Sequence, residues 1–392
     1  MQRSTARILT SHVGSLMRPE AIRRYSLATA GGEEVDQAAF ASALRREVHA
    51  IVHEQAARGV DVVSDGELGK PAWTGYSWQR LTGFELRDDP DFLRFIGRDR
   101  VRFKGFWDEA IREQMQGAPR VMAPKQWLCT GPISYTDAGR AAMQRDVRNL
   151  LHALQDAPVK EAFLPVAAPC SIAPSYANAY YKSEEEFLFA LADAQHEEYK
   201  IIVDAGLLVQ VDDAILANLH DAVVDSGRDY PRWVQMNIEA LNHALRGIPE
   251  DRVRYHLCWG SWVGPHVSDV ALEEIVDLLL KIRAQGYSIE AANPRHEHEW
   301  MVWESHQLPE GKILLPGCIC HSTAHVEHAE VVAQRILRFT NLVGRENVIA
   351  STDCGFAQGA HLRRQHPEVV WAKFDALAEG AALASGRLWK RA

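Results

Sequence analysis

The sequence predicts an α/β protein built on a single (β/α)₈ TIM barrel, with its active site at the C-terminal ends of the strands. Two observations predict this fold. Short apolar or β-branched runs alternate with longer helical patterns along all 392 residues, and polar residues follow the apolar runs. A doubly wound open sheet is the alternative, but no Gly-x-Gly-x-x-Gly turn follows an early strand. We expect residues 1–392 to form one catalytic barrel domain.

Nine runs are predicted as strands, one more than the barrel needs. They are Arg7–Ser11, Val60–Ser64, Gln126–Thr130, Phe163–Ala167, Leu207–Val211, Val253–Cys258, Ser288–Ala291, Ile313–Cys320 and Val348–Ser351. We therefore expect one run to lie outside the ring, as an irregular segment or a short hairpin.

Helical patterns lie between these runs. The clearest are Phe40–Arg58, Ser183–Ala205, Leu272–Ile282 and Val331–Leu342. Ser183, with Glu186 three residues later, is a capping box that predicts a helix start. Gly286 is predicted to stop the third helix, and Gly344 follows the fourth.

Composition excludes several classes of protein. The net charge is −9 and the pI is near 6.0, which favours neither nucleic acid nor an anionic membrane surface. The first 15 residues contain no secretory signal, and no apolar stretch is long enough to span a bilayer. Six cysteines are too sparse for a disulfide framework. We expect a cytoplasmic protein whose reduced thiols are available as metal ligands.

The sharpest candidate for chemistry is His256-x-Cys258, with Glu290 and Cys354 downstream. Zinc binds thiolate, imidazole and carboxylate ligands in tetrahedral geometry. Histidine and cysteine two residues apart can share a metal if the second stands where the strand gives way to a loop. Competing sets are Cys318-x-Cys320 with His321, and His296-x-His298. Plain packing of buried cysteines is the simplest alternative.

Seven segments follow one another with regular spacing. They are Ser11–Leu16 with Arg18-Pro19, Val60–Glu67, Leu208–Asp213, His256–Gly260, Tyr287–Glu290, Cys318–Ser322 and Ser351–Gly355. In this order they resemble the C-terminal catalytic barrel of the cobalamin-independent methionine synthase family. The resemblance covers nearly the whole chain, and seven ordered matches are far more specific than any one motif.

The resemblance implies a zinc-dependent methyltransferase that activates a homocysteine-like thiol and methylates it, as 5-methyltetrahydropteroyltriglutamate–homocysteine methyltransferases do. The implied Zn²⁺ ligands are His256, Cys258, Glu290 and Cys354. The implied general acid is His321, and the amino-acid end of the thiol is held by Ser15, Glu67 and Asp212. Two carboxylates suit an ammonium group, and backbone N–H groups near Gly14 suit a carboxylate. The implied partners are a small thiol and a methyl or alkyl donor.

Three departures from the family pattern fall on the folate side of the site. Ala214 replaces a proline, Asn218 replaces an acid that contacts the pterin, and residues 130–135 replace Gly-Asp-x-Ser-Arg-Pro. The additional N-terminal barrel of full-length members has no counterpart in this sequence. The thiol and zinc half of the pattern is therefore kept, whereas the folate half is not, and the donor, methylfolate included, stays open.

Aromatic residues offer two interpretations. The family's stacking tryptophan falls near Ser175-Tyr176, so Tyr176, Tyr180 or Tyr181 could stack on a ring, and a packed aromatic loop is the equal alternative. Eleven tryptophans could line an apolar pocket or form ordinary core, among them Trp73, Trp78, Trp127, Trp259 and Trp262.

Other reactions within this superfamily compete with thiol methylation. One is a zinc-dependent alkyl transferase or lyase acting on another thiol, such as epoxyalkane–coenzyme M transferase. Glu67 and Asp212 favour an amino thiol, because an ammonium group binds to carboxylates, whereas a sulfonate is an anion and binds to cationic side chains. A zinc-bound water would instead make a hydrolase or lyase, although thiolate ligands lower the Lewis acidity of the metal.

Overall fold

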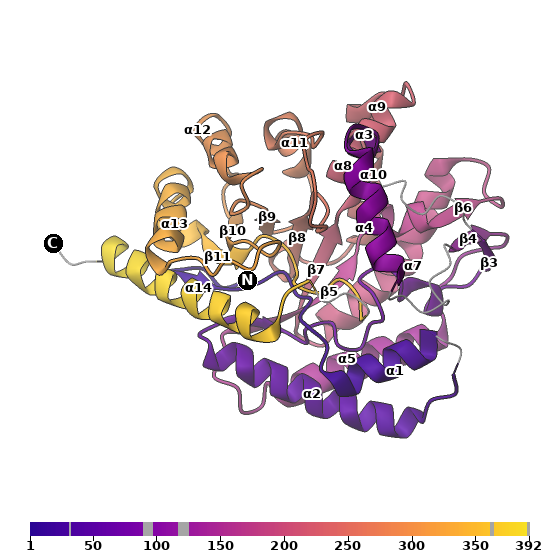
Figure 1. The fold of residues 1–392 in the computed structure, drawn as a ribbon, viewed down its shortest axis with the longest axis horizontal. Coiled ribbons are helices and arrows are strands. Elements are labelled where there is room, and N and C mark those ends of the chain that lie inside the picture. The colour runs from indigo at the N-terminus through magenta and orange to yellow at the C-terminus, as the bar shows by residue number, and fades with distance from the viewer. Residues whose placement is uncertain (31–32, 89–96, 117–124, 361–363, 390–392) are drawn as a thin grey trace.

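The computed structural model describes residues 1–30, 33–88, 97–116, 125–360 and 364–389, and its centre is a barrel of eight parallel strands (Figure 1). The strands follow the order β1-β11-β10-β9-β8-β7-β5-β2. A parallel bridge between Ser11 and Val62 joins the two ends of this order, so the sheet closes on itself. The predicted (β/α)₈ fold is therefore confirmed.

The barrel strands agree closely with eight of the nine predicted runs. They are β1 (Leu9–Thr10), β2 (Val62–Ser64), β5 (Glu161–Ala167), β7 (Leu208–Asp213), β8 (Val253–Leu257), β9 (Gly286–Ile289), β10 (Ile313–Ile319) and β11 (Ile349–Thr352). The ninth run, Gln126–Thr130, lies outside the ring as β4 (Lys125–Cys129). It pairs antiparallel with β3 (Phe84–Asp88) and parallel with β6 (Tyr176–Asn178), in a small sheet beside the barrel (Figure 1).

Helices surround the barrel (Figure 1). They are α1 (Glu20–Ala30), α2 (Gln37–Ala57), α3 (Gly97–Arg102), α4 (Lys104–Gln116), α5 (Asp137–Ala153), α6 (Pro169–Ile172), α7 (Glu184–Asp204), α8 (Ile215–Asn218), α9 (His220–Asp225), α10 (Tyr230–Ala244), α11 (Leu272–Leu279), α12 (Val302–Ser305), α13 (Ala329–Val343) and α14 (Pro367–Leu388). No helix in the described part of the chain is both long and apolar enough to cross a membrane.

Local sequence signals set the ends of two predicted helices. Ser183 caps α7, because its hydroxyl accepts the backbone N–H of Glu186 at 3.1 Å. The Glu186 carboxylate reaches back to the N–H of Lys182 at 3.0 Å, one residue earlier than a standard capping box. Gly344 caps α13 with a φ of 88°, in the left-handed region that favours glycine.

The predicted role of Gly286 is wrong. Helix α11 ends at Leu279, and Gly286 is instead the first residue of β9. Tight turns end the helix earlier, with the N–H of Ile282 donating to the carbonyl of Leu279 at 3.0 Å. A Cβ at Gly286 would lie 2.9 Å from Leu315 Cδ1 and 2.9 Å from Met1 Sδ, so the glycine leaves room for the ends of these two side chains. The residue therefore takes part in packing at the start of β9 rather than in helix termination.

The barrel interior is filled by side chains rather than being open. Arg254 of β8 is fully buried there, and its guanidinium donates to Ser11 Oγ at 2.9 Å and to the carbonyl of His12 at 3.0 Å. The guanidinium also lies 3.9 Å from the centre of the Phe163 ring. These contacts tie β8 to the chain that leaves β1, directly below the strand ends that carry the polar residues.

Two glycines of α14 provide a matched test of helix packing. A Cβ on Gly380 would lie 2.5 Å from Val332 of α13, whereas a Cβ on Gly386 meets nothing within 4 Å. We expect Gly380→Ala to lower stability by about 1–3 kcal/mol through overpacking. Gly386→Ala should raise it by about 0.5–1 kcal/mol, because alanine is the better helix former. Differential scanning calorimetry measures both, and a stabilising Gly380→Ala would contradict this packing.

Candidate active site

A cavity of about 400 Å³ opens at the C-terminal end of the barrel. Six of the eight predicted site residues line it: Ser15, Glu67, Asp212, His256, Cys258 and Cys354. Asp212 and His256 lie in β7 and β8, and Cys258 directly follows β8. The other three lie in the loops after strands: Ser15 after β1, Glu67 after β2 and Cys354 after β11. Convergence of parallel strand ends therefore brings together residues that are up to 339 positions apart in the chain.

Three buried side chains at the floor of this cavity form a compact set of potential metal ligands. The ligand atoms of His256, Cys258 and Cys354 all lie within 4.8 Å of one another. The two sulfurs are 3.4 Å apart, too far for a disulfide bond, and both residues are free thiols. Neither ring nitrogen of His256 has a hydrogen-bond partner among the described residues. Buried imidazole nitrogens without partners, beside two thiols, fit the donor set that zinc takes in proteins.

The two thiols titrate as a pair. A hydrogen bond from Cys258 lowers the pKa of Cys354 well below its usual value, against the opposing effect of burial. The same hydrogen bond raises the pKa of Cys258 well above its usual value. One thiolate at Cys354 is therefore favoured even in the absence of a cation, which gives the group a soft, negatively charged centre.

Glu290 and His321 belong to an adjacent buried group. Their ligand atoms and those of Asp353 lie within 4.8 Å of one another. Glu290 accepts the backbone N–H of Trp259 at 3.0 Å on one oxygen and Asn293 Nδ2 at 2.9 Å on the other. Burial raises the pKa of Glu290, and the charge of Cys354 adds to this effect. The structure thus brings together three of the four predicted metal ligands and holds Glu290 beside them.

His321 is buried, and neither of its ring nitrogens has a hydrogen-bond partner within the described residues. Burial lowers the pKa of its imidazole, while the charges of Cys354 and Asp353 act in the opposite direction. His321 does not belong to the ligand group of His256, Cys258 and Cys354. Its position next to that group leaves a polar ring free to interact with a ligand.

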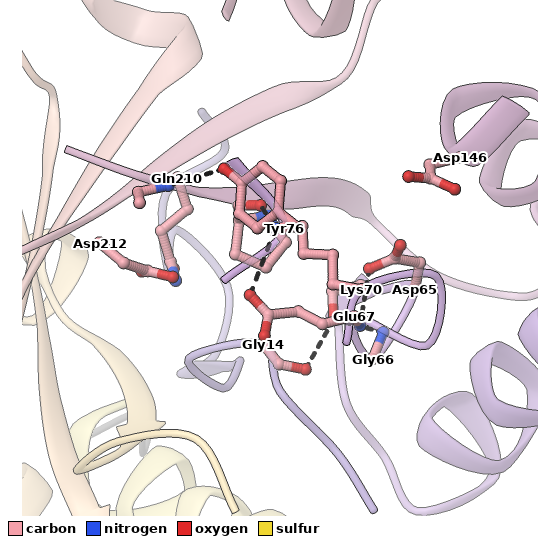
Figure 2. A network of polar contacts seen from close by, with 12 residues as sticks. Gly14, Asp65, Gly66, Glu67, Lys70, Tyr76, Asp146, Gln210 and Asp212 are labelled. Atoms are coloured by element: carbon pink, nitrogen blue, oxygen red, sulfur yellow. Dashed lines mark hydrogen bonds and ion pairs between the residues drawn. The ribbon is translucent and has the colours of Figure 1, made fainter. Parts of the chain in front are cut away.

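Glu67 stands in a strained turn at the end of β2. Its φ of 57° is the one positive value at a non-glycine residue in the described chain, and Gly66 before it has a φ of 66°. Asp65 holds the turn by accepting the N–H of Glu67 at 2.9 Å. One Glu67 oxygen lies 3.5 Å from Nζ of Lys70, and the other is buried without a partner (Figure 2). The strained turn therefore holds one oxygen of the carboxylate in a salt bridge and leaves the other free.

Asp212, the second predicted acid, is one of two adjacent aspartates with different surroundings. It accepts Gln210 Nε2 at 2.8 Å (Figure 2), and burial raises the pKa of its carboxyl, with the Glu67 charge adding to this effect. Asp213 instead accepts the hydroxyl of Tyr255 at 3.0 Å and the N–H of Ile215 at 3.0 Å. Asp213 is therefore occupied in shaping the chain after β7, whereas Asp212 keeps an oxygen available to the cavity.

Two of the tryptophans that could line a pocket do border the cavity, whereas Tyr180 and Tyr181 do not. Trp73 and Trp262 line it, and Trp73 packs against the two cysteines. Tyr180 is 51% exposed, and the hydroxyl of Tyr181 accepts the N–H of Ile133 at 2.9 Å, away from the cavity. The side chain of Tyr176 lies outside the described part of the structure. Trp78 and Trp127 stack on each other at 5.4 Å, and Trp259 is fully buried, so these three do not line the cavity.

The competing ligand sets do not assemble among the described residues. His296 lies between Glu299 at 2.8 Å and Asp269 at 3.1 Å, so both of its nitrogens are engaged. Cys318 and Cys320 are in no cluster of potential ligands. The remaining cluster among the described residues, His49, His53 and Asp156, is partly exposed, and none of its members lines the cavity.

Sequence reasoning missed two cations near the cavity. Lys70 lies three residues after Glu67, a spacing at which a salt bridge across one turn could have been anticipated. Arg364 lines the cavity from the segment between β11 and α14. No periodic pattern marks that segment, so nothing in the sequence pointed to Arg364.

Comparison with known proteins gives the family. Residues 114–369 match the model of the cobalamin-independent synthase catalytic domain. The chain belongs to this family. It is 23% identical to a methionine synthase of Thermococcus kodakarensis over 353 residues, 88% of this chain and 86% of the relative. It is 24% identical to a methionine synthase of Saccharolobus solfataricus, covering 97% and 96% of the two chains.

Solved structures of this family have the same fold. A B12-independent methionine synthase from Shewanella sp. W3-18-1, in complex with selenomethionine, superposes with a TM-score of 0.72 at 20% identity, covering 98% of this chain and 99% of that one. A putative vitamin-B12-independent methionine synthase from Listeria monocytogenes has a TM-score of 0.65 at 19% identity, with coverage of 98% and 99%. At these identities the similarity shows the shared fold.

Proposed function

We propose that this protein is a zinc-dependent methyltransferase that activates a homocysteine-like thiol and transfers a methyl group to its sulfur, with residues 1–392 working as one catalytic barrel domain. The observation that carries the proposal is the His256–Cys258–Cys354 group on the floor of a cavity that also contains Glu67 and Asp212. Membership of the cobalamin-independent synthase family and relatives named methionine synthase support the same reaction.

His256, Cys258 and Cys354 would hold the metal, with Glu290 beside them as a fourth, exchangeable ligand. Zinc bound there would supply a Lewis acid that lowers the pKa of a substrate thiol, so that the thiol reacts as a thiolate at neutral pH. Trp73 covers the two cysteines with an apolar surface, which excludes water from the sulfur that is to be alkylated.

Glu67, Asp212 and Ser15 would orient the amino-acid end of the thiol. The free oxygen of Glu67 and the cavity-facing carboxyl of Asp212 suit an ammonium group. Ser15, which lines the cavity, is suited to the carboxylate, whereas the backbone N–H groups of Val13, Gly14 and Leu16 are engaged within the protein. Lys70 fixes the other oxygen of Glu67 and thereby keeps the rotamer of this side chain constant.

His321 would provide the proton that the leaving group takes as it departs. Its unpartnered ring lies beside the ligand group without belonging to it. An imidazole near a thiolate can hold a proton at neutral pH and release it when charge develops on the leaving group.

A second candidate function is alkyl transfer to a sulfonate thiol, as in epoxyalkane–coenzyme M transferases. The observation that favours it is Arg364, a cation in a cavity where the sequence had predicted only acids.

A thiol panel tests the proposed function directly. We expect L-homocysteine, but not coenzyme M, to add a zinc–sulfur scattering path in the zinc X-ray absorption spectrum of the holoenzyme. The acids at the cavity wall favour an ammonium group and disfavour an anion at the same place. A new path with coenzyme M alone would select the second candidate function. No new path with any thiol would refute thiol activation altogether.

Metal analysis tests the ligand assignment. We expect about one zinc per chain, because the buried donors form a single N/S site. The protein should first be dialysed against a weak chelator to strip the exposed His49–His53–Asp156 cluster. Cys258→Ser and Cys354→Ser should each lose the zinc and the activity, whereas the control Cys318→Ser should keep both. Full zinc content in both cysteine variants would rule out this site.

Glu67→Gln should raise KM for L-homocysteine by at least about tenfold, because a hydrogen bond to a charged group contributes roughly 1.5–3 kcal/mol. Asp212→Asn should act in the same direction. The matched control is 4-mercaptobutanoate, which lacks the amino group and whose binding should change little in either variant. Equal losses for both thiols would mean that the acids shape the cavity and do not bind the ammonium group.

His321→Asn should retain stoichiometric zinc and bind thiol normally, yet lose about 10²–10⁴-fold in turnover through the missing proton donor. Zinc content, thiol affinity and kcat are measured on the same preparation. Collapse of zinc affinity would make His321 a ligand instead. Retention of zinc together with full turnover would leave His321 without a role in the reaction.

A further inference from the structure

Arg364 is the one arginine that lines the cavity in the described part of the chain. It lies between β11, which leads to Cys354, and α14. The residue is half-buried, whereas its Nη1 is fully buried and has no hydrogen-bond partner among the described residues. A buried guanidinium donor without a partner lowers the stability of the free protein, so its retention at a cavity wall points to a ligand.

Arg364 lines the same cavity as the two cysteines, near enough for their charges to act on it. Burial lowers the pKa of Arg364, and the charges of Cys354 and Cys258 oppose that effect. Arginine remains protonated at neutral pH even after such a shift. The guanidinium is therefore a fixed positive charge close to the sulfur atoms, on the wall of the same cavity.

Neither cysteine satisfies the open donor. Nη1 has no acceptor, sulfur or oxygen, within the described residues. Glu290 is engaged by Trp259 and Asn293, and neither Glu67 nor Asp212, which also border the cavity, accepts a hydrogen bond from Nη1 of Arg364 among the described residues. The cavity thus holds a guanidinium donor for which the described protein supplies no acceptor.

We infer that Arg364 binds an anionic group, a carboxylate or a similar oxyanion, on a substrate that occupies this cavity. A guanidinium presents paired N–H donors that match the two oxygens of such a group. The inference rests on the proposed function and extends it, because it assigns an anion subsite on the cysteine side of the cavity, separate from the acids that would hold an ammonium group. The anion belongs either to the thiol acceptor or to the methyl donor.

Two thiols that differ only in a carboxylate distinguish these sources. L-Homocysteine and 3-aminopropane-1-thiol share the thiol and the amino group, and only the first carries the carboxylate. If the acceptor supplies the anion, Arg364→Met should weaken binding of L-homocysteine to the zinc-loaded enzyme by about 10–100-fold. Binding of 3-aminopropane-1-thiol should change less than about twofold. Isothermal titration calorimetry measures both affinities without requiring turnover.

Sulfate serves as the probe for the second source. If the anion belongs to the donor, the thiol affinities of Arg364→Met should match those of the wild type. Sulfate should then bind to the wild-type enzyme already saturated with L-homocysteine, and Arg364→Met should abolish that binding. If the acceptor supplies the anion, L-homocysteine should exclude sulfate, whereas 3-aminopropane-1-thiol should not.

Arg387→Met is the matched control, since Arg387 pairs with Glu330 on the surface and should behave as the wild type in every titration. Arg364→Lys, measured in the same way, covers the case in which Arg364→Met does not fold.

The inference is overturned if neither thiol selectivity nor sulfate affinity depends on Arg364, or if its replacement removes the zinc. Failure of the wild-type enzyme to bind any thiol would instead refute the proposed function, and the sulfate titration would still test the anion subsite.

Discussion

The geometry of the site depends on one buried carboxylate, that of Asp353. It accepts the backbone N–H groups of Ala291 and Ala292 at 2.8 and 2.7 Å, and Asn293 Nδ2 at 3.2 Å. Asp353 directly precedes Cys354, and Ala291 directly follows Glu290, so these bonds fix the end of β11 against the end of β9. Three donors offset the desolvation of the carboxylate, which otherwise strongly disfavours burying a charge. The fold leaves space for it only because Gly317 has no side chain, since a Cβ there would lie 1.9 Å from Asp353 Oδ1.

Around this fixed frame, several polar groups have at least one atom without a hydrogen-bond partner among the described residues. Glu67 has an oxygen paired with Lys70 and an oxygen with no partner, and Arg364 has an open Nη1. His256 and His321 each have unpartnered ring nitrogens. Most buried polar groups in a folded protein are satisfied, so several open ones around a single cavity mark a site organised for ligands. The positive φ of Glu67 agrees with this, because backbone strain is retained where the surrounding structure serves a site.

Much of the fold and part of the site could be predicted from the sequence, for a physical reason. Alternating short apolar runs and helical patterns specify a parallel barrel, and a barrel brings its strand ends to one mouth. Residues on strands or immediately after them, such as Asp212, His256 and Cys258, were therefore predictable as neighbours. Arg364 lies in a connection with no periodicity, and its position depends on contacts that only the folded chain creates. For Tyr181 the alternative of a packed aromatic loop holds, because its hydroxyl accepts the backbone N–H of Ile133, a contact that only the folded chain creates.

The difference between strand ends and irregular connections also separates the two halves of the proposed reaction. The metal and thiol half is built from strand ends whose positions the barrel fixes, so it changes little without loss of the fold. Another part of the cavity is built from connections, with Trp73, Ala214, Asn218 and Trp262 bordering it. Ala214 belongs to the same buried cluster as Cys258 and Cys354, so the proline-to-alanine departure from the resembling family lies beside the proposed metal ligands. Asn218, the second departure, also lines the cavity, whereas residues 130–135 do not. Departures on these connections are what a retained thiol chemistry combined with a different donor would produce.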